Sequence, residues 1–182
     1  MEREKALALL KQHMKADNLI KHSIASEAVM KRVARKLGGD EDRYALAGLL
    51  HDIDVELTEN MPEKHALIAM DLLPDSLPAE VRNAIKRHNE QNGSVREGTI
   101  DFALTASESL TGLVTAMALI IPDKKLSSVK ASSIIKRMKE KGFARNVSRE
   151  AIRECEKIGI PLPEFIEMGV ESMKEISGEL GL

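Results

Sequence analysis

The sequence predicts an all-α fold. Apolar residues recur at three- and four-residue spacing through nearly all of the 182 residues. Runs of alternating β-branched residues bounded by turns, which mark strands, are absent. The hydrophobic share of 43% and the charged share of 31% exclude the disordered class and allow a buried core. We therefore expect one helical domain that spans residues 1–182.

Caps and helix breakers divide the first half of the chain. Asp17 or Asn18 can cap a second helix, and Gly38 and Gly39 can stop it in the left-handed conformation. An acidic cap or a proline suits the start of each later helix in this half. The predicted helices span residues 2–15, 17–37, 40–51, 62–72 and 78–88.

The second half begins with a polar, glycine-containing loop at residues 89–98. Thr99 can cap a long helix over residues 100–120, whose apolar stretch is interrupted by polar residues and is shorter than the roughly 20 residues of a membrane span. We expect a core helix there and no membrane partner. Three more helices are expected within residues 127–178, with starts at Ser127 or Ser128, at Ser148, and at Pro161 and Pro163.

Charge and cysteine content narrow the class of protein. With 27 basic and 29 acidic residues and four aromatic residues, the chain has neither the field nor the stacking surface that nucleic-acid binding uses, so we expect no such partner. Lys124, Lys125, Lys130, Lys136 and Arg137 form a basic stretch that either attracts a phosphorylated ligand or is a solvated helix face. The single cysteine, Cys155, and an N-terminus unlike a secretory leader favour the cytoplasm.

All five histidines, His13, His22, His51, His65 and His88, lie in the first half of the chain. Each falls on an apolar stripe of its predicted helix, so each imidazole is expected to point inward. An inward imidazole is either a metal ligand or a hydrogen-bonded core residue.

The adjacent pair His51 and Asp52 follows an almost wholly apolar run at residues 45–50. A carboxylate buried there without a partner would cost several kcal/mol, and protonation, a cationic side chain, helix-terminus donors or a metal ion would each relieve that cost. An imidazole, a carboxylate and a second imidazole suit Mn²⁺, Fe or Zn²⁺.

Residues 47–54, together with His22, His65 and His88, resemble the HD-domain metal-dependent phosphohydrolase superfamily, and its HDIG-type branch in particular. The resemblance covers about residues 19–119. It implies a helical bundle in which a histidine, a His-Asp pair and a distant aspartate bind one metal ion. Some members bind two, using extra histidines.

Carried onto this chain, the resemblance makes His22, His51 and Asp52 metal ligands and makes His65 and His88 the additional histidines. Ser107 stands where the distant aspartate is expected. Glu108 is the nearest carboxylate, about 100° around the helix.

Beside Asp52, two further carboxylates are candidate catalytic residues. Asp54 replaces a glycine of the family pattern, and Glu56 follows it. Both lie close enough to the ligand pair to orient water or act as a general base, or they simply begin a surface loop.

The resemblance implies a hydrolase that uses Mn, Fe, Zn, Ni or Co to cleave a phosphomonoester or phosphodiester, including that of a nucleotide. The first alternative is a degenerate HD domain that binds a phosphorylated small molecule or nucleotide as a sensor, which Ser107 favours. The second is a helical interaction protein whose methionines line a partner surface.

Overall fold

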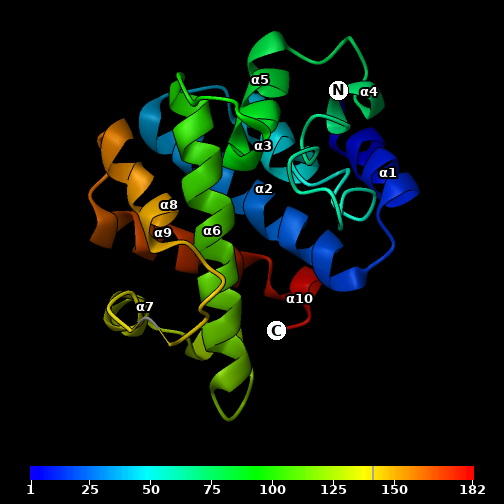
Figure 1. The fold of residues 1–182 in the computed structure, drawn as a ribbon. Helices are drawn as coiled ribbons and strands as arrows, with labels where there is room; N and C mark the ends of the chain where they lie inside the picture. Colours follow the sequence, from blue (N-terminus) through cyan, green and yellow to red (C-terminus); the bar gives the residue numbers. More distant parts are fainter. Residues whose placement is uncertain (141) are drawn as a thin grey trace.

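The computed structural model describes residues 1–140 and 142–182, so Lys141, within the predicted C-terminal helical region, lies outside the described residues. Across the described residues the regular structure is helical without strands, which confirms the predicted all-α class (Figure 1). Three short 3₁₀ helices span Glu90–Asn92, Leu126–Ser128 and Glu154–Ile158. The α-helices are α1 (Arg3–His13), α2 (Asp17–Leu37), α3 (Glu41–Leu50), α4 (Ala69–Leu72), α5 (Ala79–His88), α6 (Thr99–Ile120), α7 (Ala131–Arg137), α8 (Arg149–Arg153), α9 (Leu162–Glu175) and α10 (Ser177–Leu180).

Helices α2 and α6 organise the fold. In Figure 1, α6 runs down the middle of the molecule and α2 crosses behind it. Helix α2 packs against α3, α6 and α9, while α6 also packs against α5 and α8. Leu49, Leu104, Leu110 and Phe165 are fully buried in the core that these helices share.

Helix α6 is long and apolar enough to cross a membrane by length and composition alone. However, 61% of its most apolar window is buried inside the protein, as expected of a core helix. This agrees with the expected core helix, whereas the expectation that the segment is too short to cross a membrane is wrong, because the helix has 22 residues.

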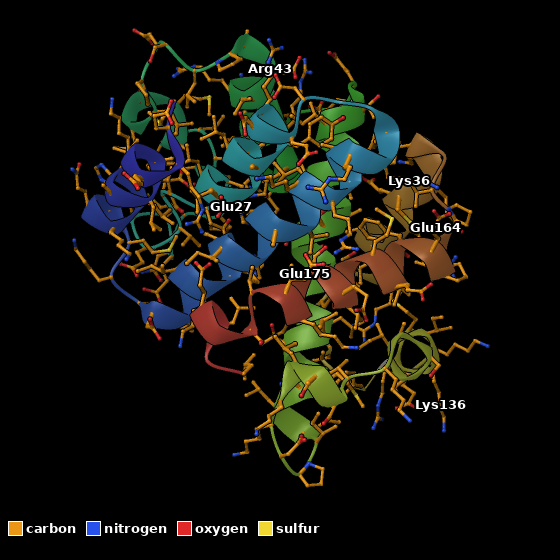
Figure 2. The ribbon with its side chains drawn as sticks, turned by 180° about the vertical axis from the view of Figure 1, so that it is seen from behind. Glu27, Lys36, Arg43, Lys136, Glu164 and Glu175 are labelled. Carbon is orange, nitrogen blue, oxygen red and sulfur yellow. The ribbon has the colours of Figure 1, made fainter. Side chains whose placement is uncertain are left out.

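On the back of the molecule, α9 lies beside α2 (Figure 2). Lys36 Nζ on α2 lies 2.5 Å from Glu164 Oε1 on α9, and Arg32 pairs with Glu175 further along. Gly169 on α9 permits the close approach to α6, because a Cβ atom there would lie 2.3 Å from Leu110 Cδ2. The apolar sides of α2, α6 and α9 are thereby buried together.

Several predicted caps are confirmed. Gly38 ends α2 with a φ of 69°, in the left-handed conformation. The Asp40 carboxylate accepts hydrogen bonds from the second and third backbone N–H groups of α3, and Ser148 Oγ caps α8 by accepting from Ala151 N–H. The cap of α3 matters most for function, because this helix leads into His51 and Asp52.

The predicted helix over residues 62–72 is wrong for most of its length. Only Ala69–Leu72 is α-helical, and residues 51–68 form successive turns. The Asp54 carboxylate accepts hydrogen bonds from the N–H groups of Ala66 and Ala69, and Ala66 adopts a φ of 68°. A left-handed residue interrupts a right-handed helix, so His65 lies on a turn.

Other predicted helix starts are shifted. Ala16 rather than Asp17 or Asn18 is the N-cap of α2, and Gly98 rather than Thr99 is that of α6. Ser127 and Ser128 lie in a 3₁₀ helix, and Lys130 is the N-cap of the next α-helix, so neither serine caps it. The next α-helix begins at Ala131.

Candidate metal centre

The candidate site forms where four chain segments meet. Helix α3 ends at Leu50, so His51 and Asp52 project from its carboxyl end. Helix α2 supplies His22, the turn before α4 supplies His65, and the last residue of α5 is His88. Each segment adds a polar side chain to an otherwise apolar interior.

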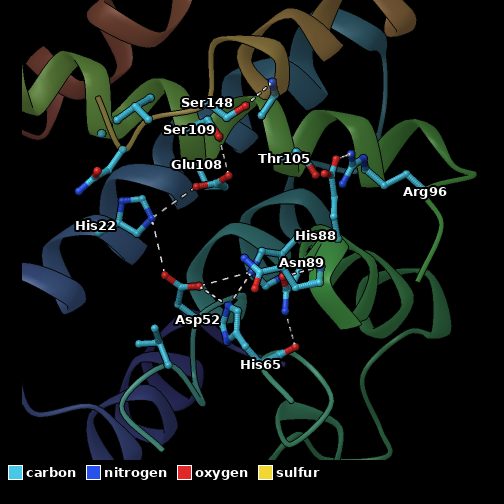
Figure 3. Close-up of a pocket in the computed structure, with 17 residues that line it drawn as sticks. His22, Asp52, His65, His88, Asn89, Arg96, Thr105, Glu108, Ser109 and Ser148 are labelled. Carbon is cyan, nitrogen blue, oxygen red and sulfur yellow. Dashed lines mark hydrogen bonds and ion pairs between the residues drawn. The ribbon is translucent and has the colours of Figure 1, made fainter. Parts of the chain in front are cut away.

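The Asp52 carboxylate is the centre of the cluster (Figure 3). Its Oδ2 lies 3.3 Å from His51 Nε2 and 3.7 Å from His22 Nε2. Its Oδ1 lies 3.2 Å from His65 Nε2 and 3.5 Å from His88 Nε2. One carboxylate thus faces the Nε2 atoms of four imidazoles, which the structure brings together as the sequence predicted.

The opposite ring nitrogens of two histidines are bound to backbone carbonyls. His51 Nδ1 donates to Gly48 O at 2.8 Å, and His88 Nδ1 donates to Ile85 O at 2.6 Å. A neutral imidazole carries one proton, so in the neutral form of either ring the Nε2 atom presents its lone pair to the cluster. His51 Nε2 is buried and has no hydrogen-bond partner among the residues that the structure describes. Lone pairs and a carboxylate at such distances repel one another in a buried site, and a cation bound between them would remove this repulsion.

Burial and charge shift the pKa values in opposite directions. Burial lowers the pKa of His22 and His88. It also acts against ionisation of Asp52, but the surrounding imidazoles, His51 foremost, hold the pKa of Asp52 well below its usual range. His65 keeps a proton despite burial, because hydrogen bonds to Asp52 and Asp54 raise its pKa to about 9. Burial also acts to lower the pKa of His51, but the Asp52 carboxylate outweighs burial and raises it overall. The cluster therefore combines an ionised carboxylate with neutral imidazoles at His22 and His88, and deprotonated donors of this kind bind divalent metals.

On α6, Glu108 rather than Ser107 reaches this cluster. Glu108 Oε2 lies 4.0 Å from His22 Nε2, while Ser109 Oγ donates to Glu108 Oε1 at 2.6 Å. Ser107 is fully buried, does not line the cavity at the site, and its hydroxyl has no partner among the described residues.

Among the described residues, two groups of three side chains could each hold a metal ion, because the potential ligand atoms within each group lie within 4.8 Å of one another. The first is His22, His51 and Glu108, and the second is His51, Asp52 and His88. His51 belongs to both groups, which places it between them.

The carboxylates of Asp54 and Glu56 have other partners. Asp54 is fully buried, with Oδ1 accepting from His65 Nδ1 at 2.8 Å and Oδ2 accepting from two backbone N–H groups. Glu56 Oε1 accepts from the backbone N–H groups of Lys15 and Ala16 and lies outside the cavity lining. Each carboxylate fixes a chain segment near the site.

A cavity of about 510 Å³ opens above the cluster. Its wall includes residues that the sequence interpretation did not single out, among them Gln91, Arg96, Thr105 and Asn146. Arg96 Nε lies 2.8 Å from Glu154 Oε2. Neither His13 nor the basic residues at 124–137 line this cavity.

The sequence interpretation also did not identify Thr111 as a residue of the site. Its Oγ1 lies 3.1 Å from His22 Nδ1. Its position three residues after Glu108 puts both on one helix face, and that spacing was the available signal.

A family model described as the HD domain matches residues 19–118. Ribonuclease Y of Lawsonia intracellularis is 31% identical over 96 residues, which cover 52% of this chain and 18% of that protein. Ribonuclease Y of Sulfurovum sp. (strain NBC37-1) is 27% identical over 173 residues, or 90% of this chain and 34% of that protein. The matched part of the chain thus spans 18% and 34% of the length of these two relatives. No solved structure matches it significantly.

Proposed function

We propose that this chain, which belongs to the HD-domain family, hydrolyses phosphate esters with a bound divalent cation. The single observation that carries the proposal is the convergence of the Nε2 atoms of His22 and His51 on the ionised carboxylate of Asp52. The family resemblance supports the phosphoester substrate, and the site chemistry supports the cation.

The residues present fit such a cation. His51 Nε2 is a buried nitrogen without a hydrogen-bond partner in the described part of the chain, and a metal bond would satisfy it. Mixed imidazole and carboxylate donors suit Mn, Fe, Zn, Ni or Co. We assign the ion to His22, His51 and Asp52, whose facing atoms lie 3.3–3.7 Å apart at the carboxylate, and we assign Glu108, which groups with His22 and His51, to the place of the family's distant aspartate.

A bound divalent cation would lower the pKa of water toward neutrality and polarise a phosphoryl oxygen. The side chains around it bind and orient the ester. His65 and His88 are placed to hold a second ion or, through a protonated His65 Nε2, to donate a hydrogen bond to a phosphoryl oxygen. Asp54 is a positioning residue, since it holds His65 Nδ1, and Glu56 ties the turn after α3 to the start of α2.

The natural substrate class has two candidates. The sequence favours a phosphorylated small molecule or nucleotide. The similarity to proteins named Ribonuclease Y, which extends over 90% of this chain in one case, favours an RNA phosphodiester. A sensor that binds a phosphorylated ligand without cleaving it is the non-catalytic alternative.

The test begins with elemental analysis of protein purified without chelator. We expect stoichiometric Mn, Fe, Zn, Ni or Co, and we expect Mn²⁺-supported hydrolysis of p-nitrophenyl phosphate, bis-p-nitrophenyl phosphate or a short RNA. Asp52→Ala should lose both the metal and the activity, because it removes the carboxylate that faces all four imidazoles.

His13→Gln is the matched control, because His13 lies outside the cavity and should keep wild-type metal content. Protein that takes up none of the five metals would contradict the proposal. Stoichiometric metal without hydrolysis of any of the three substrates would favour the sensor.

A further inference from the structure

Thr111 joins two elements of the candidate site. It is fully buried on α6, one turn after Glu108. Its Oγ1 lies 2.7 Å from the Glu108 carbonyl oxygen and 3.1 Å from Nδ1 of His22 on α2. One hydroxyl therefore contacts the backbone of one proposed ligand and the ring of another.

The protons in this chain of contacts can be assigned. A threonine hydroxyl has one proton to donate and two lone pairs to accept with, whereas a carbonyl oxygen only accepts. The short contact to the Glu108 carbonyl is the usual bond of a threonine back to its own helix, so the hydroxyl proton lies there. The hydroxyl must then accept from His22 Nδ1–H.

His22 differs in this respect from the other histidines of the cluster. His51 and His88 each donate Nδ1–H to the carbonyl three residues earlier in their own helix. His65 is held by the carboxylate of Asp54. For His22 the described partner of Nδ1 is a hydroxyl, which can donate or accept, so its proton assignment depends on Thr111 and on the Glu108 carbonyl beyond it.

We infer that Thr111 is a positioning residue that keeps the proton of His22 on Nδ1 and thereby directs the lone pair of Nε2 to the metal. The inference rests on the proposed role of His22 as a metal ligand. It goes beyond that role by naming the side chain that prepares the ligand, and it couples the His22 ring to the segment that carries Glu108.

The proton position can be read without metal. Long-range ¹H–¹⁵N correlation spectra of metal-free, ¹⁵N-histidine-labelled protein at pH 8 distinguish the two neutral tautomers, and His22→Gln identifies the His22 signals by their loss. We expect wild-type His22 as the Nδ1–H form. Thr111→Val, which keeps the side-chain shape and removes the hydroxyl, should populate the Nε2–H form, while Thr111→Ser should retain the wild-type pattern.

Metal affinity gives the second readout. Titration with Mn²⁺, followed by the EPR signal of the free ion, should show an affinity about 10–100-fold weaker in Thr111→Val, the usual effect of losing such a partner. Thr111→Ser should stay near wild type. Thr115→Val is the control, since it makes the same change one turn later on α6, outside the cavity lining.

Each result bears on the inference separately from the proposed function. An Nε2–H tautomer in wild type, or unchanged Mn²⁺ affinity in Thr111→Val, overturns the role of Thr111. A weakening equal to that of Thr111→Val in Thr111→Ser or Thr115→Val also overturns it, because a general packing defect would then suffice. Absence of Mn²⁺ binding to wild-type protein would instead refute the proposed site, and the tautomer result would still decide the state of His22.

Discussion

At the scale of single residues, we propose that the Glu108 carboxylate on α6 completes the metal shell. Burial raises the pKa of Glu108, and the nearby imidazoles of His22 and His51 act in the opposite direction. A divalent cation near this carboxyl group would lower its pKa and stabilise its ionised form. We therefore propose Glu108 as the acidic ligand in place of the serine before it.

Replacing Glu108 should mainly affect metal affinity, whereas replacing Ser107 should mainly affect folding stability. Glu108→Gln should weaken Mn²⁺ binding by about tenfold or more with little change in folding stability, because it removes a ligand charge from a partly open position. Ser107→Asp should leave Mn²⁺ affinity no better and destabilise the fold by several kcal/mol, because it buries an unpaired carboxylate. Metal titration and urea unfolding measure both. Tighter metal binding in Ser107→Asp would contradict the geometry of α6.

His65 predicts a pH dependence for the metal-free protein. Its pKa is about 9 in the folded protein and about 6.5 when unfolded, so protonation favours folding. This contribution of up to about 3 kcal/mol is complete below pH 6.5 and is lost as the pH rises through 9. Urea unfolding in the presence of EDTA should therefore show that the free energy of unfolding decreases more from pH 6 to pH 9.5 in wild type than in His65→Gln. Equal decreases would argue against the elevated pKa.

At the scale of helices, the crossing of α2 and α3 positions the ligand pair. Gly48 on α3 lies against the α2 backbone, where a Cβ atom would be 2.7 Å from Ser26 O and 2.8 Å from Glu27 N. Both neighbours are backbone atoms, so neither can rotate away. The absence of a side chain at Gly48 thus sets the distance between His22 on α2 and His51 on α3.

Gly48→Ala should consequently destabilise the fold by about 3 kcal/mol or more, the upper range for overpacking, and should also weaken Mn²⁺ binding. Gly178→Ala on α10 is the control, because a Cβ atom there would meet nothing within 4 Å. Thermal unfolding and Mn²⁺ titration of both variants provide the measurement. A Gly48→Ala protein with unchanged affinity would show that the crossing does not set the ligand spacing.

Helix boundaries were predicted well where a local cap decides them. Gly38 and Asp40 act within a few residues of their own position, so the end of α2 and the start of α3 followed from the sequence. The helix expected over residues 62–72 failed because its backbone bonds to Asp54, which lies outside that segment. A contact of this kind leaves no periodic signal.

At the scale of the whole molecule, the proposed ligands come from α2, α6 and the residue pair after α3. Such a set exists only in the folded chain, so metal binding should stabilise the fold by mass action. At an Mn²⁺ concentration of about 100 times Kd, the expected gain is about 2.7 kcal/mol. Differential scanning calorimetry should show a higher Tm with Mn²⁺ in wild type and no change in Asp52→Ala. An equal rise in both proteins would indicate binding elsewhere.

The sequence by itself determined the helical class and the helix boundaries at Gly38 and Asp40, because periodicity and caps are local properties, and the family resemblance indicated which histidines accompany Asp52. Only the tertiary structure decided that Glu108 rather than Ser107 faces the site, that Asp54 holds His65, and that Thr111 holds His22. The rotation of a helix about its axis is set by packing against segments far away in sequence. Thr111 and His22, 89 residues apart, meet only once α2 and α6 share a core.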